Sequence, residues 1–119
     1  MSVESDLTTR IKAQVAGISN RFYPLEMPEN PTLPAGVYQR ISTSRHYAHA
    51  EGELVQDPRF QLTFWGTYSE VMTIKWQVKA ALTGWTSYPA IFIVNEGHEY
   101  DKDLRIWAIV LDVIIWNNE

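Results

Sequence analysis

The stretch from Asp57 to Trp85, DPRFQLTFWGTYSEVMTIKWQVKAALTGW, decides the fold because a strand, a turn and a helix follow one another in it. In its first part, apolar and polar residues alternate with the two-residue period of a half-buried strand. The apolar positions of this alternation are Phe60, Leu62 and Phe64. The pattern predicts a strand over residues 58–65, which Gly66 ends.

The second part of the stretch carries the signals of a helix over residues 67–83. Thr67 and Glu70 have the T-x-x-E spacing of a capping box, in which each side chain accepts a hydrogen bond from the other residue's backbone. Gly84 suits the left-handed position that ends many helices. Three- and four-residue spacings form an apolar stripe that predicts packing on a sheet: Val71, Ile74, Val78, Ala81, Leu82 and Trp85.

Met72 and Trp76 lie four residues apart on the same helix, away from the centre of its apolar stripe. Two interpretations are open: a core face wide enough to include both, or a second contact surface for another subunit. Trp and Met are enriched at the cores of protein interfaces. Met72 and Trp76 are therefore candidate interface residues.

The chain before residue 37 is expected to form a helix followed by an extended connector. Over residues 2–18 the apolar positions recur with a helical period: Val3, Leu7, Ile11, Val15 and Ile18. Four prolines then fall within residues 21–36. Because proline fixes its own backbone angle and biases the preceding residue to extended geometry, this segment is predicted to be an extended connector.

Three further strands are predicted, over residues 37–42, 89–95 and 104–116. Residues 43–56 are polar, so we expect a loop there, either a long hairpin excursion or a partly disordered segment. With the strand at 58–65 and the two helices, the prediction is a single α+β domain. Its sheet has about four strands and is mostly antiparallel.

The strand at 104–116 is apolar on both faces, a pattern typical of a strand that is covered on both sides. Two helices leave little material to cover the second face, so Trp107 and Trp116 are candidate interface residues. Asp112 interrupts one apolar face. Because an unpaired buried carboxylate is costly, we expect Asp112 to reach water or to pair with a cation such as Arg40 or Arg105.

The loop at 43–56 supplies the remaining candidate interface residues, Arg45, His46, Tyr47 and His49. It also contributes to a set of residues that could bind a metal if two separate segments converged: His46, His49, Glu51, Glu53, His98, Glu99 and Asp101. No rigid metal-ligand spacing supports such a site. Nor does the sequence contain a P-loop, a G-x-S-x-G elbow or a cysteine nucleophile. We therefore expect no catalytic, metal or cofactor site.

Composition narrows the class of protein further. The net charge is −4 and the ten Lys and Arg residues are scattered, which argues against generic nucleic-acid binding through phosphate neutralisation. No sequence-specific nucleic-acid partner is expected either. No apolar run approaches the ~20 residues of a membrane-spanning helix. The first residues lack the layout of a signal peptide, so synthesis in the cytoplasm is expected. The chain has no cysteine and hence no disulfide.

With these features the chain resembles the phage tail completion or tail terminator family of siphophages. The resemblance rests on VYQRIS at 37–42, RFQLTFWGTYSEV at 59–71 and DVIIWNN at 112–118. In that family a strand with an R-x-Q-hydrophobic pattern and an aromatic residue enters a T/S-Y-x-E/D turn that opens a helix. The matching positions here are Arg59, Phe60, Gln61, Leu62, Trp65, Tyr68, Ser69 and Glu70.

The resemblance implies a non-enzymatic structural protein of the virion. Such proteins assemble as a ring, commonly a hexamer, at the head-proximal end of the tail tube, where they end tube growth and help join tail to head. The implied partners are other copies of the chain, the major tail tube protein and a head completion or connector protein. The residues leave a second interpretation open, a ligand-binding or enzymatic domain with a pocket lined by aromatics such as Trp65, Tyr68 and Trp107.

Overall fold

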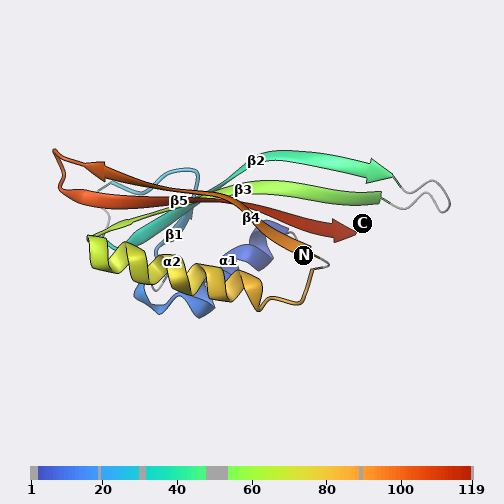
Figure 1. Ribbon diagram of the computed structural model, residues 1–119, viewed down its shortest axis with the longest axis horizontal. Coiled ribbons are helices and arrows are strands. Elements are labelled where there is room, and N and C mark those ends of the chain that lie inside the picture. Colours follow the sequence, from blue (N-terminus) through green and yellow to red (C-terminus); the bar gives the residue numbers. More distant parts are fainter. Residues whose placement is uncertain (1–2, 19, 30–31, 48–53, 89, 119) are drawn as a thin grey trace.

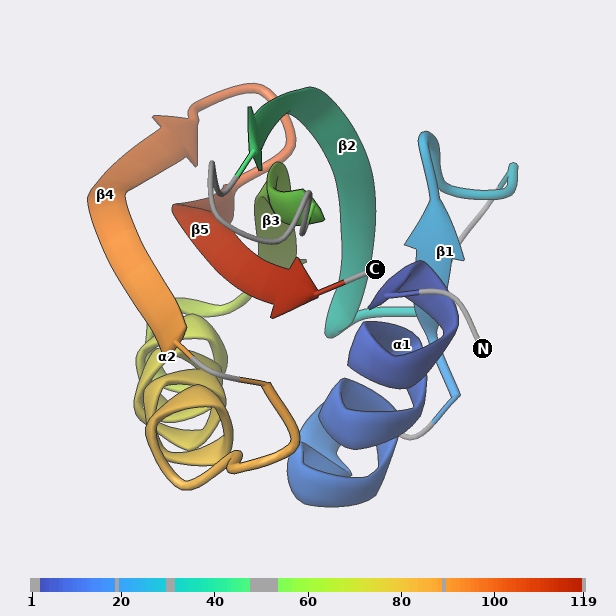
Figure 2. The ribbon, with the colours of Figure 1, turned by 90° about the vertical axis from the view of Figure 1, so that its right-hand side faces the viewer.

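Five strands form one sheet, and both helices pack on the same face of it (Figures 1 and 2). The computed structural model describes residues 3–18, 20–29, 32–47, 54–88 and 90–118. The elements in chain order are α1 (Val3–Gln14), the short 3-10 helix η1 (Ala16–Ile18), β1 (Phe22–Pro24), β2 (Ala35–Tyr47), β3 (Leu54–Gly66), α2 (Tyr68–Thr83), β4 (Ala90–Asp101) and β5 (Ile106–Asn118). No helix in these ranges is long and apolar enough to cross a membrane.

The strand order is β1-β2-β3-β5-β4. The short β1 pairs with β2 in parallel, and every other pairing is antiparallel. The predicted α+β class, the single domain and the mostly antiparallel sheet are therefore confirmed. The sheet has one strand more than the four expected.

The helix α2 begins at the predicted capping box. The Thr67 hydroxyl accepts a hydrogen bond from the Glu70 amide at 3.3 Å, and the Glu70 carboxylate accepts one from the Thr67 amide at 2.9 Å. At the other end, the prediction of a left-handed Gly84 is wrong, because its φ is −83°. The helix ends instead with the Gly84 amide donating to the Ala80 carbonyl at 3.0 Å.

The core lies between the helices and the sheet. It contains the apolar stripe of α1, the predicted stripe of α2 apart from Trp85, the alternating residues of β3 and one face of β5. Its members include Leu7, Ile11, Ile18, Phe60, Leu62, Phe64, Val71, Ile74, Val78, Leu82, Ile109, Leu111, Val113 and Ile115. This core occupies one face of the sheet, which we call the inner face; the face without helices is the outer face.

The strand β1 lies inside the predicted connector, so the expectation of an extended connector alone was incomplete. Phe22 of β1 pairs with Gly36 of β2, and its ring stacks on that of Phe64 with 5.6 Å between centroids and 3° between planes. Without a side chain at Gly36, both rings can lie directly over the β2 backbone. The strand ends after Pro24, because the next residue, Leu25, has a positive φ of 66° that turns the backbone away from extended geometry.

The two hairpins are longer than predicted. Of the two alternatives for residues 43–56, the long hairpin is supported, because β2 and β3 pair from Thr43–Pro58 out to Tyr47–Leu54; the ends of the segment are therefore strands and not loop. The mostly polar sequence of these segments shows no strand pattern. They still form strands, because the hydrogen bonds between strands are made by the backbone and do not depend on the side chains. Likewise β4 continues past residue 95 to Asp101. The hairpins extend beyond the helices at opposite ends of the molecule, which measures 55 × 24 × 23 Å (Figure 1).

Candidate interaction surfaces

The outer side of α2 carries the first candidate surface, formed by Tyr68, Met72 and Trp76 and called here the α2 surface. Trp76 is 62% exposed and Tyr68 54% exposed, whereas Met72 is half-buried. The interpretation of a wide core face is therefore wrong for Trp76. An exposed indole on a helix of an otherwise well-packed domain is the kind of residue that anchors an interface.

Two lysine side chains flank Trp76. The ammonium groups of Lys75 and Lys79 lie 5.2 and 5.1 Å from its ring centroid, within the range of cation–π attraction. Lys79 also forms an ion pair with Glu96 of β4 at 2.6 Å. The hydrogen bond from Lys79 holds the pKa of Glu96 below its ordinary value, so this pair is charged at neutral pH. These contacts hold the Trp76 ring in place while the residue stays 62% exposed.

The outer face of the sheet is the second candidate surface. Phe92, Val94 and Ile41 are between 46% and 51% exposed. On β5, Val110, Ile114 and Trp116 are half-buried and alternate with the core residues of the inner face. Trp116 thus lies on the expected uncovered face. Trp107 lies on the inner face instead, edge-on to Tyr68 at 5.1 Å and beside Tyr100 at 4.9 Å, where it is half-buried.

An ion pair between Arg59 and Asp112 lies on this outer face. The Arg59 guanidinium donates to the Asp112 carboxylate at 2.9 Å, across the β3–β5 pairing. Asp112 therefore meets a cation as expected, but neither Arg40 nor Arg105 supplies it; Arg40 pairs with Glu4 of α1 at 2.6 Å. The second carboxylate oxygen of Asp112 and Nε of Arg59 are buried without a hydrogen-bond partner among the described residues.

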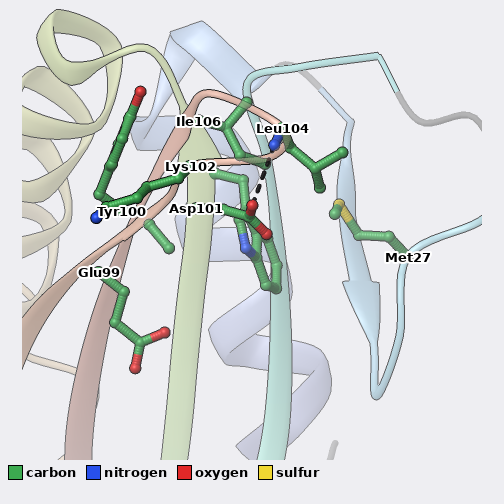
Figure 3. A pocket seen from close by; sticks show the side chains of 9 residues that line it. Met27, Glu99, Tyr100, Asp101, Lys102, Leu104 and Ile106 are labelled. Atoms are coloured by element: carbon green, nitrogen blue, oxygen red, sulfur yellow. Dashed lines mark hydrogen bonds between the residues drawn. The ribbon is translucent and has the colours of Figure 1, made fainter.

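A hollow of about 550 Å³ lies at the β4–β5 end of the molecule, and it tests the interpretation of an aromatic pocket (Figure 3). Its lining residues are Met27, Trp65, Glu99, Tyr100, Asp101, Lys102, Leu104, Ile106 and Ala108. Of the three aromatics proposed to line a pocket, the hollow contains Trp65, whereas Tyr68 and Trp107 pack against each other on the inner face. In Figure 3 Met27 and Leu104 face each other across the hollow, and the Tyr100 ring points away from them.

The polar groups of the hollow do not form a catalytic arrangement. The Asp101 carboxylate accepts hydrogen bonds from the amides of Asp103 and Leu104 at 2.9 and 3.0 Å, so it stabilises the turn between β4 and β5 (Figure 3). His98 and Glu99 are adjacent on β4 and pair opposite Ile109 and Ala108, which places their side chains on opposite faces of the sheet. Within the described ranges, no three His, Asp or Glu side chains are grouped to hold a metal ion.

The remaining candidate residues come from the β2–β3 hairpin. Arg45, His46 and Tyr47 lie in β2. They pair with Gln56, Val55 and Leu54 of β3, respectively. His49, Glu51 and Glu53 lie outside the described residues, and β3 begins at Leu54. The structure therefore places Arg45, His46 and Tyr47 near the end of the β2–β3 hairpin, which extends beyond α2, the helix that carries Trp76 (Figure 1).

One feature that sequence reasoning missed is the pair of sheet edges. Both β2 and β4 are long strands with an edge that no described strand occupies over most of its length. Side-chain periodicity reports which face of a strand is buried, but it carries no information about which backbone edge is paired. Only the strand order reveals such an edge.

Comparison with known proteins adds the following findings. A family model described as "Tail completion protein gp17" matches residues 6–117. No curated protein sequence matches the chain. A chain in the solved virion of a native gene transfer agent particle is similar in fold, with a TM-score of 0.69 at 10% identity, and the match covers 99% of this chain and 96% of the other. The type 4 fimbrial biogenesis protein PilO from Pseudomonas aeruginosa matches with a TM-score of 0.48 at 9% identity, covering 100% of this chain and 72% of PilO.

Proposed function

Because the chain belongs to the tail completion protein gp17 family, we propose that it forms a ring that caps the head-proximal end of a phage tail tube. The ring, a hexamer in this proposal, ends polymerisation of the major tail tube protein. It then presents a surface to the completion or connector protein of the head. The role is structural and requires no catalytic group.

The family match over residues 6–117 is the observation that carries this proposal. The arrangement of surfaces supports it. A closed ring of identical subunits needs two different patches on each subunit, one for each neighbour. The α2 surface and the outer face of the sheet are two such patches, and they are distinct because α2 covers the inner face (Figure 2). Surplus apolar area on both of them suits burial between copies.

The proposal is tested by removing the chain from the virus that encodes it. Without a cap, we expect tail tubes of variable and excessive length that are not attached to heads, because nothing ends tube growth or completes the joint. Electron microscopy of lysates measures tube length and head attachment, and supplying the intact chain from a plasmid is the control. Tails of uniform, normal length attached to heads in the absence of the chain would contradict the proposal.

Replacing Trp76 by glutamate is expected to reduce infectious particles by at least tenfold while the subunit stays folded. The exposed indole contributes little to the core, so the free energy of unfolding should change by about 1 kcal/mol or less, mainly from the lost cation–π contacts. In an interface, however, the variant would lose the large apolar contact of the indole and would require desolvation of a carboxylate in its place. Particle titre and thermal unfolding are measured together.

The matched control for this variant is Ala13→Glu, which adds the same charge at an exposed position of α1. It should leave the titre near that of the unmodified chain. If Trp76→Glu also leaves the titre unchanged, the α2 surface makes no contact needed for assembly.

A further inference from the structure

Two free strand edges on opposite sides of the sheet complement each other. We propose that the free edge of β4 in one copy pairs with the free edge of β2 in the next copy, so that the ring is closed by a continuous intersubunit sheet. This inference rests on the proposed ring and specifies how its subunits join. It is argued from strand order, strand direction and register.

The first edge belongs to β2. The strand β1 pairs only with Gly36–Tyr38, and the Leu25 amide donates to the Tyr38 carbonyl at 2.9 Å. From Gln39 to Tyr47 no described strand lies on this side of β2. At about 3.3 Å per residue, this free edge is roughly 30 Å long.

The second edge belongs to β4, the last strand on the other side of the sheet. It pairs with β5 from Ala90–Trp116 to Asp101–Ile106, and its opposite edge meets no described strand. Monomeric proteins protect long edges with proline, lysine or a covering segment. The segment Ala90–Asp101 contains neither proline nor lysine, and it carries the exposed Phe92 and Val94. Such an edge is suited to pairing with another strand.

Strand direction favours pairing between unlike edges. Going from β2 through β3 and β5 to β4, each neighbour is antiparallel to the last, so β2 and β4 run in opposite directions. When copies follow one another around a ring with similar orientation, β4 of one copy therefore meets β2 of the next in an antiparallel pair. This pair would extend the existing sheet with the same geometry, and the same contact can repeat at every subunit.

Register across the sheet shows how far the copies must be staggered. Gln39, Gln61, Asp112 and Asn95 form one continuous row of partners. Without a stagger, Gln39 of one copy would meet Asn95 of the next, and the rest of β4 would run into the position that β1 already occupies beside β2. Shifting β4 until its Asp101 end reaches the end of β1 removes this clash. Sheets that close on themselves require a stagger of this kind.

The staggered register makes a specific prediction about neighbouring side chains. Asp101 can reach no farther than Gln39, the first residue of β2 beyond its pairing with β1, so Glu99 of one copy lies near Ile41 of the other. Ile41 and Glu99 both lie on the outer face of the sheet. Opposed residues in an antiparallel pair have Cβ atoms about 4.5–5.5 Å apart, which a disulfide can bridge. Asn95 would then lie roughly 13 Å farther along the strand, beyond the reach of a disulfide.

Pairs of introduced cysteines test the inference. The unmodified chain has no cysteine, so any disulfide between copies must come from the introduced residues. Ile41→Cys is combined with Glu99→Cys, and the matched control combines Ile41→Cys with Asn95→Cys. Each variant chain replaces the natural one in the virus, and purified particles are oxidised mildly and separated on a non-reducing gel. Each single variant is tested in parallel, and thermal unfolding of the isolated chains checks that they fold.

The expected result is a covalent series beyond the dimer for the Ile41 and Glu99 pair, with at least a tenfold weaker series for the Asn95 control. A strong series for the control alone would overturn the staggered register. A dimer from Glu99→Cys alone would indicate symmetric β4–β4 pairing, and particles without any cross-linked species would exclude pairing of these edges. Absence of the unmodified chain from purified particles would contradict the proposed function itself.

Discussion

Replacing Gly36 by alanine is expected to lower the free energy of unfolding by about 1–3 kcal/mol, although the change adds one methyl group. A Cβ atom at this position would lie 2.5 and 2.6 Å from ring carbons of Phe64 and 2.9 Å from a ring carbon of Phe22. Both rings are almost completely buried and stacked, so neither can move without disturbing the core. Chemical denaturation measures the loss.

Gly97→Ala is the matched control for this variant. It also lies in a strand, but no atom lies within 4 Å of the position of its added Cβ, so its effect should stay within about 0.5 kcal/mol. Combining Gly36→Ala with Phe64→Leu should give less than the sum of the single losses, because a smaller side chain makes room for the methyl group. Strict additivity would show that the ring contact is not the cause.

Replacing Arg59 by methionine is expected to destabilise the protein by about 2–4 kcal/mol at neutral pH. The substitution keeps much of the aliphatic volume but removes the cation that pairs with Asp112 at 2.9 Å. The Asp112 side chain is only 10% exposed, so the remaining carboxylate would be charged, buried and unpaired. Thermal or chemical unfolding measures this cost.

Removing both charges separates the cost of an unpaired carboxylate from the value of the pair. The double variant Arg59→Met with Asp112→Leu should recover most of the stability lost by the single variant, since an apolar pair of similar volume often replaces a buried ion pair without loss. If the double variant is as unstable as Arg59→Met alone, packing at Arg59 rather than charge is responsible. Arg40→Met removes a guanidinium from a more exposed pair and should cost about 1 kcal/mol or less.

The part of the fold that was predictable from sequence is the part in which side-chain pattern and backbone structure agree. The capping box at Thr67 and Glu70 and the alternation of Phe60, Leu62 and Phe64 both mark positions where burial repeats with the period of the element. The strand ends at 43–47 and 54–57 have no such pattern, because their sequence is mostly polar and its few apolar residues do not alternate. Their pairing comes from the backbone of the neighbouring strand, which a pattern of side chains does not encode.

The candidate surfaces, like the fold, were predictable only where the side-chain pattern shows which residues are exposed. Trp76 and Trp116 could be found because a large apolar residue falls outside the core period or on an uncovered face. Trp107 is also a large apolar residue on a strand with two apolar faces. The alternation along β5, however, places it on the inner face, where it packs between Tyr68 and Tyr100. The partner of Asp112 depended on the register between β3 and β5, which local sequence does not determine.

The helices cover only the middle of a sheet whose hairpins extend past them at both ends (Figure 1). Residues near the middle share one cooperative core, whereas the outer rungs of each ladder are held mainly by their own backbone hydrogen bonds. Resistance to local opening should therefore fall from the centre of each strand to its end in the isolated subunit. In a ring joined along these edges, a neighbour would supply the stabilisation that the subunit lacks, and the assembled ring rather than the single chain becomes the unit that unfolds.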